Sequence, residues 1–282
     1  MKIAILGRGK QGMKHLRAFQ TLPAVERVLT ADIDPARAGE LDPDAAIDAA
    51  DGVVIATPTT THDGLLRRAL DAGKPVLCEK PLVAPVAECN PAARIAYLYR
   101  MAPEIAAARR RILSGELGAI RTAAFRIAAT GGQAAWKHRR AEGGGALNEL
   151  ASHMIDLALW FFGDIESATL LDSTCRLPRR TIAGREEACD AEDHVTFRLD
   201  FRSGVIATIE ADFAAPRFAQ ELTIEGAHNS LRASILSAGD LDLYAMQAQA
   251  FLDAIAAPEA ANPLCTLREA ASTARILDEL RR

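Results

Sequence analysis

A glycine-rich turn between a short apolar run and a helical stretch constrains the fold more than any other feature of this sequence. Residues 2–6 (KIAIL) form an apolar run without turn residues, which predicts a buried strand. Residues 7–12 (GRGKQG) have the G-x-G-x-x-G spacing, and a helical pattern follows to about residue 22. Strand, turn and helix in this order are typical of a dinucleotide-binding unit, because glycine permits the tight turn, the approach of a pyrophosphate and close helix packing.

An acidic residue after the next predicted strand strengthens this prediction. The strand spans about residues 25–31, and Asp32 lies 20 positions after Gly12. A carboxylate there accepts hydrogen bonds from both adenosine ribose hydroxyls and repels a 2′-phosphate, so we predict NAD as the cofactor. The alternatives are a plain Asp-Pro turn, and NADP if Arg8 and Arg37 outweigh Asp32. The predicted phosphate-binding residues of the turn are Gly7, Arg8, Gly9, Lys10, Gln11 and Gly12.

Two more predicted strands end in loops at the same edge of the sheet. Residues 52–56 lead into Thr57 and Pro58, and His62 follows at the start of a helix to about residue 72. Because the carboxyl ends of parallel strands form the ligand crevice, we expect all three residues near the cofactor. The alternative for His62 is a hydrogen bond to its own helix start. Thr60 or Thr61 is expected to cap that helix.

The strand at residues 75–78 leads into Glu79, Lys80 and Pro81. A lysine at the carboxyl end of a strand, held by a proline, is placed to reach a bound nicotinamide and its substrate. Residues 82–93 contain Pro85 and Pro91, so any helix there is short, and residues 94–99 are predicted to form a further strand.

The pattern changes after about residue 100. Residues 100–114 are helical after Pro103, and residues 120–129 alternate as a strand. Strand-like runs with short connections then indicate an antiparallel sheet: 166–177, 193–201, 205–213, 218–225 and 228–235. Helices are predicted at about 241–256 and 267–280. We therefore predict an α/β Rossmann domain with a doubly wound parallel sheet at 1–100, and at 101–282 an α+β domain with an open, mainly antiparallel sheet flanked by helices.

Residues 143–163 (GGGALNELASHMIDLALWFFG) carry the most chemical information. Three glycines suggest a flexible approach to a helix over 146–162. Glu149, His153 and Asp156 fall on one stripe of this helix. Imidazole has an ordinary pKa of about 6.5 and suits proton transfer near neutral pH. The alternative is a core helix with a polar seam. The stripe expected to face the core consists of Leu147, Leu150, Met154, Leu157, Ala158 and Phe161.

Composition excludes several classes of protein. The chain has 282 residues, of which 49% are hydrophobic, and a net charge of −4, which argues against disorder and against nucleic acid as a partner. No apolar run reaches the length of a membrane span, and the first residues lack the pattern of a signal peptide. The five scattered cysteines predict reduced thiols in a cytoplasmic protein and no metal site.

These motifs together resemble the Gfo/Idh/MocA oxidoreductases, the family of glucose–fructose oxidoreductase and inositol dehydrogenase. The resemblance covers nearly the whole chain. It depends on GRGKQG followed by His15, on Asp32, on ATPTTTH and CEKPL, and on the segment 143–163. It implies a Rossmann domain followed by an open sheet that covers the nicotinamide. It also implies hydride transfer between NAD(P) and a hydroxyl of a sugar, inositol, sugar nucleotide or related polyol.

The resemblance also implies roles for individual residues. Lys80 would contact the substrate and the nicotinamide, Glu79 would lie near the nicotinamide ribose, and the Lys80–Pro81 bond would be cis. His153 would be the acid–base and would meet Lys80 over the nicotinamide, with Glu149 orienting His153 or binding a hydroxyl. Relatives commonly pair through the open sheet, which implies a homodimer or homotetramer.

Departures from the family pattern leave the substrate open. Glu149 stands where the family has aspartate, Ala151 stands where glycine is usual, and the helix after Pro81 is shortened. The further candidate substrate-binding residues are Tyr97, Arg100, Trp136 and Lys137, with His138, Arg139 and Arg140 as neighbours of the last two. An exposed basic loop is the alternative for residues 136–140. The alternative functions are oxidation or reduction of a dihydrodiol, an imine or a C=C bond, and a non-catalytic NAD-binding regulator.

Overall fold

The computed structural model describes residues 1–37, 39–82, 90–132, 134–235 and 241–282. The chain forms two compact units. Met1–Met101 groups with Asp240–Ala274, and Ala102–Gly239 groups with Arg275–Arg282. One division therefore lies beside the expected boundary near residue 100. The segment 240–274, however, belongs to the first unit, although the expected second domain included it.

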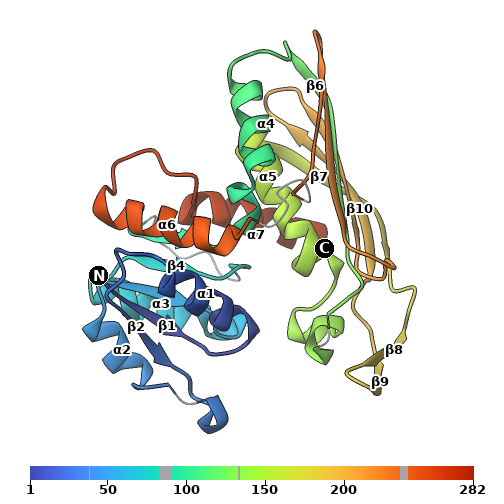
Figure 1. Cartoon of the computed structure of the whole chain (residues 1–282). Coiled ribbons are helices and arrows are strands. Elements are labelled where there is room, and N and C mark those ends of the chain that lie inside the picture. Colours follow the sequence, from blue (N-terminus) through green and yellow to red (C-terminus); the bar gives the residue numbers. More distant parts are fainter. Residues whose placement is uncertain (38, 83–89, 133, 236–240) are drawn as a thin grey trace. The chain divides into compact units, whose positions relative to one another are not determined.

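A six-stranded sheet in the order β14-β5-β4-β3-β1-β2 forms the centre of the first unit (Figure 1). The first five strands in sequence are parallel, and β14 joins β5 antiparallel at the edge. The strands are β1 Lys2–Leu6, β2 Arg27–Ala31, β3 Gly52–Ile55, β4 Val76–Cys78, β5 Ala93–Ile95 and β14 Cys265–Thr266. Every residue of β3 and β4 is buried, as expected for a sheet covered on both faces.

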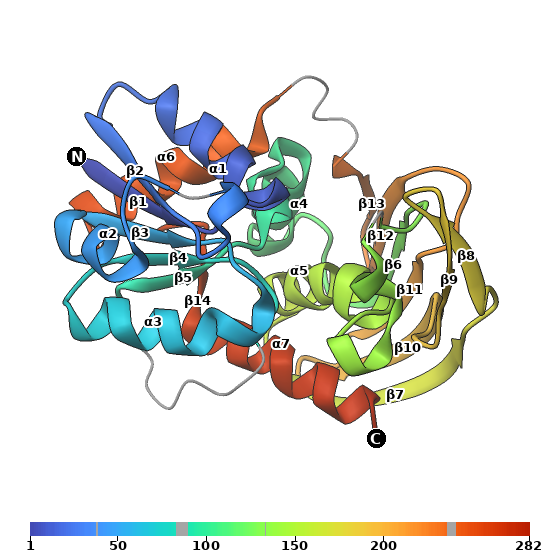
Figure 2. The same ribbon diagram turned by 90° about the horizontal axis from the view of Figure 1, so that it is seen from below.

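Helices cover the two faces of this sheet (Figure 2). Apolar residues of α2 (Pro43–Ala49), α3 (His62–Asp71) and the start of α7 (Leu267–Leu280) share one hydrophobic cluster with the strands. Residues of α1 (Lys10–Gln20) and α6 (Leu243–Ala256) share the cluster on the other face. This is the doubly wound arrangement that the sequence predicts.

Helix α6 explains why the segment 240–274 groups with the first unit. The Asp242 side chain accepts hydrogen bonds from the first free N–H groups of the helix, those of Tyr244 and Ala245. Phe251 is 1% exposed, and its ring meets that of Phe19 edge-on, with 6.3 Å between centroids. The helix thus completes the apolar face that α1 leaves open.

A second six-stranded sheet, in the order β13-β12-β6-β11-β10-β7, defines the second unit. Its neighbours are antiparallel except for the parallel pair β6 and β11, so the sheet is mainly antiparallel as predicted. The strands are β6 Ile120–Ala128, β7 Ile165–Thr174, β10 His194–Phe201, β11 Ile206–Asp212, β12 Ala219–Gly226 and β13 Ser230–Ala233. Strand β6 lies between β11 and β12, which the sequence order alone does not reveal.

Helices of the second unit pack on one face of this sheet. Helix α5 (Ser152–Phe162) follows a π-helical turn, Leu147–Ala151, and its Phe161 and Phe162 rings contact Phe125 of β6. Helix α4 spans Pro103–Leu113. Strand β10 alternates buried and accessible residues, which is the pattern of a sheet with one covered face.

The structure differs from the sequence-based expectations at one strand and one hairpin, and one further expectation lies outside the described residues. The strand expected at 94–99 ends at Ile95, and a 3₁₀ helix, Leu98–Met101, follows it. The hairpin β8 (Arg179–Ile182) and β9 (Arg185–Ala188) was not expected. Its strands lack apolar alternation, and its turn is Ala183-Gly184, with φ of 49° and 80°, where the usual turn signal is Asn-Gly. The short helix expected at 82–93, with Pro85, falls largely on residues 83–89, outside the described residues.

Among the described residues, no helix has both the length and the apolar character that crossing a lipid bilayer requires.

The first prediction concerns α6. Phe251→Ala should destabilise the first unit by about 3–5 kcal/mol, because it removes a buried ring and leaves a cavity against Phe19. Hydrogen exchange of peptides from β1 and β5, combined with urea unfolding, measures the effect. Met246→Ala is the matched control, since Met246 lies on the same helix but is 38% exposed. Equal effects of the two substitutions would contradict the assignment of α6 to this core.

Candidate functional site

The carboxyl ends of four parallel strands bring the predicted cofactor residues of the first unit to one edge of its sheet. The turn Gly7–Gly12 follows β1, Asp32 follows β2, Thr57 comes two residues after β3, and Glu79 follows β4. Strand β1 lies between β2 and β3, and the connection after β1 runs to β2 on one side whereas the connection after β3 runs to β4 on the other, so the strand order reverses between β1 and β3. Such a switch point is where doubly wound sheets bind nucleotides.

The glycine-rich turn has the geometry that a dinucleotide requires. Gly7 has φ of +92°, and a Cβ on Gly12 would lie 1.8 Å from the Gly7 carbonyl oxygen, so neither position tolerates a side chain. Around Gly9, by contrast, a Cβ would meet only a guanidinium nitrogen of Arg37, at 3.7 Å. Gly9 is the N-cap of α1 and provides no capping side chain. The first N–H groups of the helix are therefore available to phosphate oxygens.

Asp32 is held as a carboxylate at the end of β2. Its Oδ2 accepts the N–H of Arg8 at 2.7 Å, and its Oδ1 accepts the N–H of Asp34 at 2.9 Å. Partial burial acts to raise the pKa of Asp32, but these N–H groups and the charges of Arg37 and Arg8 outweigh it and lower the pKa. The ionised carboxylate suits recognition of ribose hydroxyls. The Arg37 Nε atom lies 3.8 Å from Oδ2, so both arginines named as NADP candidates lie beside Asp32.

The other turn residues differ in their surroundings. Lys10 is exposed at the first position of α1, whereas the Gln11 side-chain amide donates to the Tyr244 hydroxyl at 3.1 Å. Gln11 is thus hydrogen-bonded to helix α6 of the same unit.

The loop after β3 is ordered by its own hydrogen bonds. His62 is 2% exposed, and its Nε2 lies 3.0 Å from the Thr57 carbonyl oxygen, while burial lowers the pKa of its imidazole. Thr61 stands at the expected N-cap position of α3, but its hydroxyl donates to the Pro58 carbonyl oxygen and makes no capping hydrogen bond to the helix. Exposed Pro58 and half-buried Thr57 border the strand ends.

Glu79, the residue immediately before Lys80, forms a buried hydrogen-bonded pair with His15. His15 Nε2 lies 2.9 Å from Glu79 Oε1, and the two side chains are 0% and 11% exposed. Burial acts to raise the pKa of Glu79, but the hydrogen bond and charge of His15, with Lys80 and His62, outweigh it and lower the pKa. The Lys80–Pro81 bond is cis, as the resemblance implied. The pair fixes the residue immediately before Lys80.

Tyr244 joins this pair from α6. Its ring meets that of His15 edge-on at 5.2 Å, and the Lys14 ammonium lies 4.9 Å from the ring centroid. In the sequence, only the family resemblance marks His15, and no feature marks Tyr244. The signal for His15 is its place three residues after Gly12 on a helix that packs against β1; nothing in the sequence places Tyr244 here.

In the second unit, the expected helix begins with the π-helical turn Leu147–Ala151, which carries Glu149, and continues as α5. His153 is half-buried near the start of α5, whereas Asp156 is 1% exposed and lies in the interior. All residues of the stripe expected to face the core are buried, as predicted.

Two of the three glycines before this helix are closely packed, because a Cβ on Gly144 or Gly145 would lie within 2.4 Å of another atom, whereas a Cβ on Gly143 would meet nothing within 4 Å. A Cβ on Gly145 would lie 2.2 Å from the Glu192 carboxylate, which accepts the N–H of Leu147 at 3.1 Å. Glu192 therefore caps the helix start from across the unit, a role that its sequence position does not indicate.

Lys137 and Glu149 form a close ion pair. The Glu149 side chain is 9% exposed and that of Lys137 is 31% exposed, while the Lys137 ammonium lies 5.1 Å from the centroid of the exposed Trp136 ring. A carboxylate, an ammonium and an aromatic ring thus lie together one helical turn before His153.

Five further candidate substrate-binding residues contact other residues of the protein. His138 is 4% exposed and stacks on Phe213, Arg139 pairs with Glu142 and Glu187, and the N–H of Arg140 donates to Asp190. In the first unit, Tyr97 lies in a hydrophobic cluster, and Arg100 is 2% exposed with its Nη1 3.2 Å from Glu269. These contacts give Tyr97 and Arg100 structural roles.

Known protein families match both units of the chain. The family described as "Oxidoreductase family, NAD-binding Rossmann fold" matches residues 1–98, and the "GFO/IDH/MocA C-terminal domain" matches residues 105–232. The fold and the strand-end site thus define an NAD-binding oxidoreductase with a Rossmann domain. The chain belongs to the Gfo/Idh/MocA family.

Individual relatives are sugar and inositol dehydrogenases. The chain is 26% identical to levoglucosan dehydrogenase of Pseudarthrobacter phenanthrenivorans, over 75% of this chain and 67% of that protein. It is 28% identical to inositol 2-dehydrogenase 2 of Saccharopolyspora erythraea, over 74% and 66%. The chain thus spans about two thirds of the length of these relatives. A solved levoglucosan dehydrogenase in complex with NADH and L-sorbose has the same fold, with a TM-score of 0.86 at 21% identity over 100% of this chain and 95% of that one.

The second prediction concerns the buried pair. Glu79→Gln keeps the shape but removes the charge beside His15, so it should destabilise the first unit by roughly 1–3 kcal/mol at pH 7. Folding lowers the pKa of Glu79 from its ordinary value of 4.5, so its stabilisation is present above that pH and is lost as the pH falls through the lower folded value. The difference in the free energy of unfolding between Glu79→Gln and wild type should therefore become smaller below about pH 4.5.

Urea unfolding of both proteins at pH 7 and pH 4 measures this difference. Glu116→Gln is the control, because Glu116 also has a lowered pKa, caused by Arg111, but is exposed; it should leave stability unchanged. A difference for Glu79→Gln that stays constant between the two pH values contradicts the pairing.

Proposed function

We propose that this protein transfers a hydride between NAD and a secondary hydroxyl of a sugar, inositol, sugar nucleotide or related polyol. One observation carries the proposal: the strand ends of the first unit converge on a side-chain-free turn, an ionised Asp32, and Lys80 fixed beside the buried Glu79–His15 pair. This set combines dinucleotide recognition with a cation at the strand end. Membership of an oxidoreductase family, with sugar and inositol dehydrogenases among the relatives, supports the choice of substrate class.

The residues of the first unit fit a dinucleotide. The pyrophosphate would lie against Gly9 and the free N–H groups of α1, and Asp32 would accept hydrogen bonds from the adenosine ribose hydroxyls. NAD, when bound, supplies the hydride-accepting nicotinamide. Asp32 would repel a 2′-phosphate, which favours NAD over NADP.

Lys80 and His153 are the proposed catalytic residues. The Lys80 ammonium stabilises negative charge that develops on the substrate oxygen as its proton leaves. The His153 imidazole accepts that proton from the hydroxyl and returns it in the reverse direction. Because Glu79 is buried and paired with His15, the backbone at Lys80 is held without reorganisation during the reaction.

Glu149 and Lys137 are proposed to bind the remaining hydroxyls of the substrate. The Glu149 carboxylate accepts hydrogen bonds, the Lys137 ammonium donates them, and the exposed face of Trp136 suits the apolar side of a sugar ring. Glutamate extends one methylene further than the aspartate usual in the family, and the ion pair with Lys137 fixes its position.

A homodimer or homotetramer formed through the open sheet of the second unit, and a cytoplasmic location, are also part of the proposal. The face of that sheet opposite α5 carries ionic pairs such as Arg126 with Glu210, and Leu171 of strand β7 is 58% exposed.

The third prediction tests the catalytic residues. Lys80→Met and His153→Ala should each lower turnover by roughly 10²–10⁴-fold on the best substrate of a panel of sugars, inositols and other polyols. NAD affinity should change by no more than a few-fold, because neither side chain is assigned to the adenosine or phosphate groups. Reduced-nicotinamide absorbance follows turnover, and calorimetry follows NAD binding.

Lys2→Met and His194→Ala are matched controls from the same two units and should turn over normally. Normal turnover in either catalytic variant contradicts its role. Binding of NAD without turnover on any member of the panel contradicts the dehydrogenase assignment and favours the non-catalytic regulator.

The fourth prediction tests the choice of cofactor. Asp32→Ala should weaken NAD binding roughly tenfold or more, because it removes charge-assisted hydrogen bonds to two hydroxyls. The same variant should gain affinity for NADP, since Arg37 and Arg8 then face a 2′-phosphate without a competing carboxylate. Asp34→Ala is the control: it removes another carboxylate that pairs with Arg37, at 2.8 Å, but lies outside the predicted ribose contact. Unchanged NAD affinity in Asp32→Ala removes this residue from the site.

A further inference from the structure

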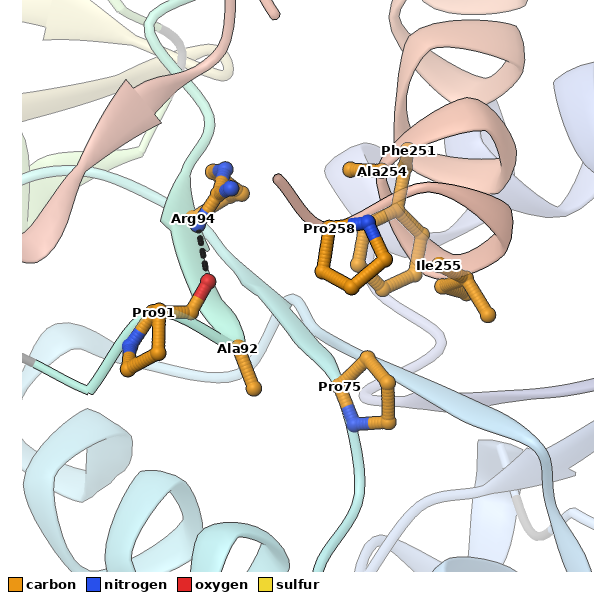
Figure 3. A pocket seen from close by; sticks show the side chains of 8 residues that line it. All are labelled: Pro75, Pro91, Ala92, Arg94, Phe251, Ala254, Ile255 and Pro258. Atoms are coloured by element: carbon orange, nitrogen blue, oxygen red, sulfur yellow. Dashed lines mark hydrogen bonds between the residues drawn. The ribbon is translucent and has the colours of Figure 1, made fainter. Parts of the chain in front are cut away.

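A small cavity lies in the first unit at the opposite ends of the strands from the glycine-rich turn. Pro75 immediately precedes β4, and Pro91 and Ala92 immediately precede β5, so these residues border the amino ends of both strands. Figure 3 shows α6 on the other side, with Phe251 and Ile255 facing the strand residues. The cavity has a volume of about 150 Å³ and is lined by Pro75, Pro91, Ala92, Arg94, Phe251, Ala254, Ile255 and Pro258.

Arg94 is the one charged residue among these eight. It lies in β5 opposite Leu77 of β4, whose side chain shares the hydrophobic cluster of Phe251, whereas the flanking Ala93 and Ile95 belong to the cluster on the other face. Side chains alternate along a strand, so Arg94 projects toward α6 and the cavity.

The guanidinium of Arg94 is buried with incomplete pairing. Arg94 is 7% exposed, and its Nη1 donates to the carbonyl oxygens of Pro91 and Ala93, the first of which is drawn in Figure 3. Its Nε is buried and, among the described residues, has no hydrogen-bond partner. Burial lowers the pKa of Arg94, against the opposing effect of Glu269, which is itself paired with Arg100. A buried cation that lacks a carboxylate contact destabilises the folded state unless a ligand supplies the missing partner.

We propose that this cavity binds a small monocarboxylate with an apolar body. The carboxylate accepts hydrogen bonds from N–H groups of the Arg94 guanidinium, the group whose planar geometry suits carboxylates. The hydrocarbon part lies against Phe251 and Ile255. A cavity of this size holds a six-membered carbon ring. A phosphate is disfavoured, because the apolar walls would leave its remaining oxygens without partners.

The site is separate from the proposed nucleotide site, because the two lie at opposite ends of the same parallel strands. Glu79 and Lys80 follow the carboxyl end of β4, whereas Pro75 precedes its amino end. Binding here therefore does not depend on the proposed hydride transfer, and its test is independent of turnover.

Benzoate is the probe, and the Ile255 methyl signal in NMR spectra of the full chain reports occupancy. Benzoate should shift this signal saturably with a dissociation constant on the order of 1 mM. Benzyl alcohol, which has a similar shape without the charge, should bind roughly tenfold more weakly or not at all. Arg94→Gln should weaken benzoate roughly tenfold or more and leave benzyl alcohol unchanged.

Two further variants make the outcome decisive. Ala254→Trp keeps Arg94 but fills the cavity, so it should abolish benzoate binding even if Arg94→Gln fails to fold. Arg17→Gln removes the same charge from an exposed position of the same unit and should bind benzoate like wild type. No saturable shift up to about 50 mM, equal affinity for benzoate and benzyl alcohol, or wild-type affinity in Arg94→Gln or Ala254→Trp would each overturn the proposal.

Discussion

The close contact of helix α1 with strand β1 is the constraint on which the candidate nucleotide site depends. Gly12 lies so near the Gly7 carbonyl that a methyl group at Gly12 would stand 1.8 Å from that oxygen. This contact fixes the helix N-terminus at the carboxyl end of β1, beside the ends of β2 and β3. Strand pairing then brings Asp32 and the loop at Thr57 to the same edge of the sheet, where local hydrogen bonds hold them. The same helix carries His15 inward to Glu79, so one packing contact sets both the phosphate-binding end and the residue before Lys80.

The buried pair of His15 and Glu79 links three distant parts of the first unit. His15 comes from α1, Glu79 from the end of β4, and the ring of Tyr244 from α6, more than 160 residues after Glu79. A carboxylate in the interior is tolerated only with partners that compensate for the lost water, and the main ones here are the hydrogen bond with His15 and the charge of Lys80. A structural role for Glu79 therefore accompanies any contact with a cofactor ribose.

Local signals predicted the nucleotide half well. Apolar runs, glycine spacing and Asp32 are encoded within a few residues, and β1 to β4, α1 and α3 lie close to their predicted ranges, whereas α2 was not predicted and the strand expected at 94–99 ends at Ile95. Long-range features were not predictable in this way. The place of β6 between β11 and β12, the cap that Glu192 gives to Leu147, and the Lys137–Glu149 pair all join residues with no local pattern in common. The polar hairpin at Ala183-Gly184 was missed because neither its strands nor its turn carries the usual composition.

The return of α6 to the first unit has a consequence for synthesis. Until residues 243–256 have been made, Phe19 and Leu77 lack the helix that covers their face of the sheet. The ribosome needs on the order of ten seconds to add the residues between 101 and 243, and during that time a nearly complete nucleotide-binding sheet presents an apolar surface. Residues 1–101 are therefore exposed to chaperones and to aggregation until residue 256 has been made, although they form most of the sheet.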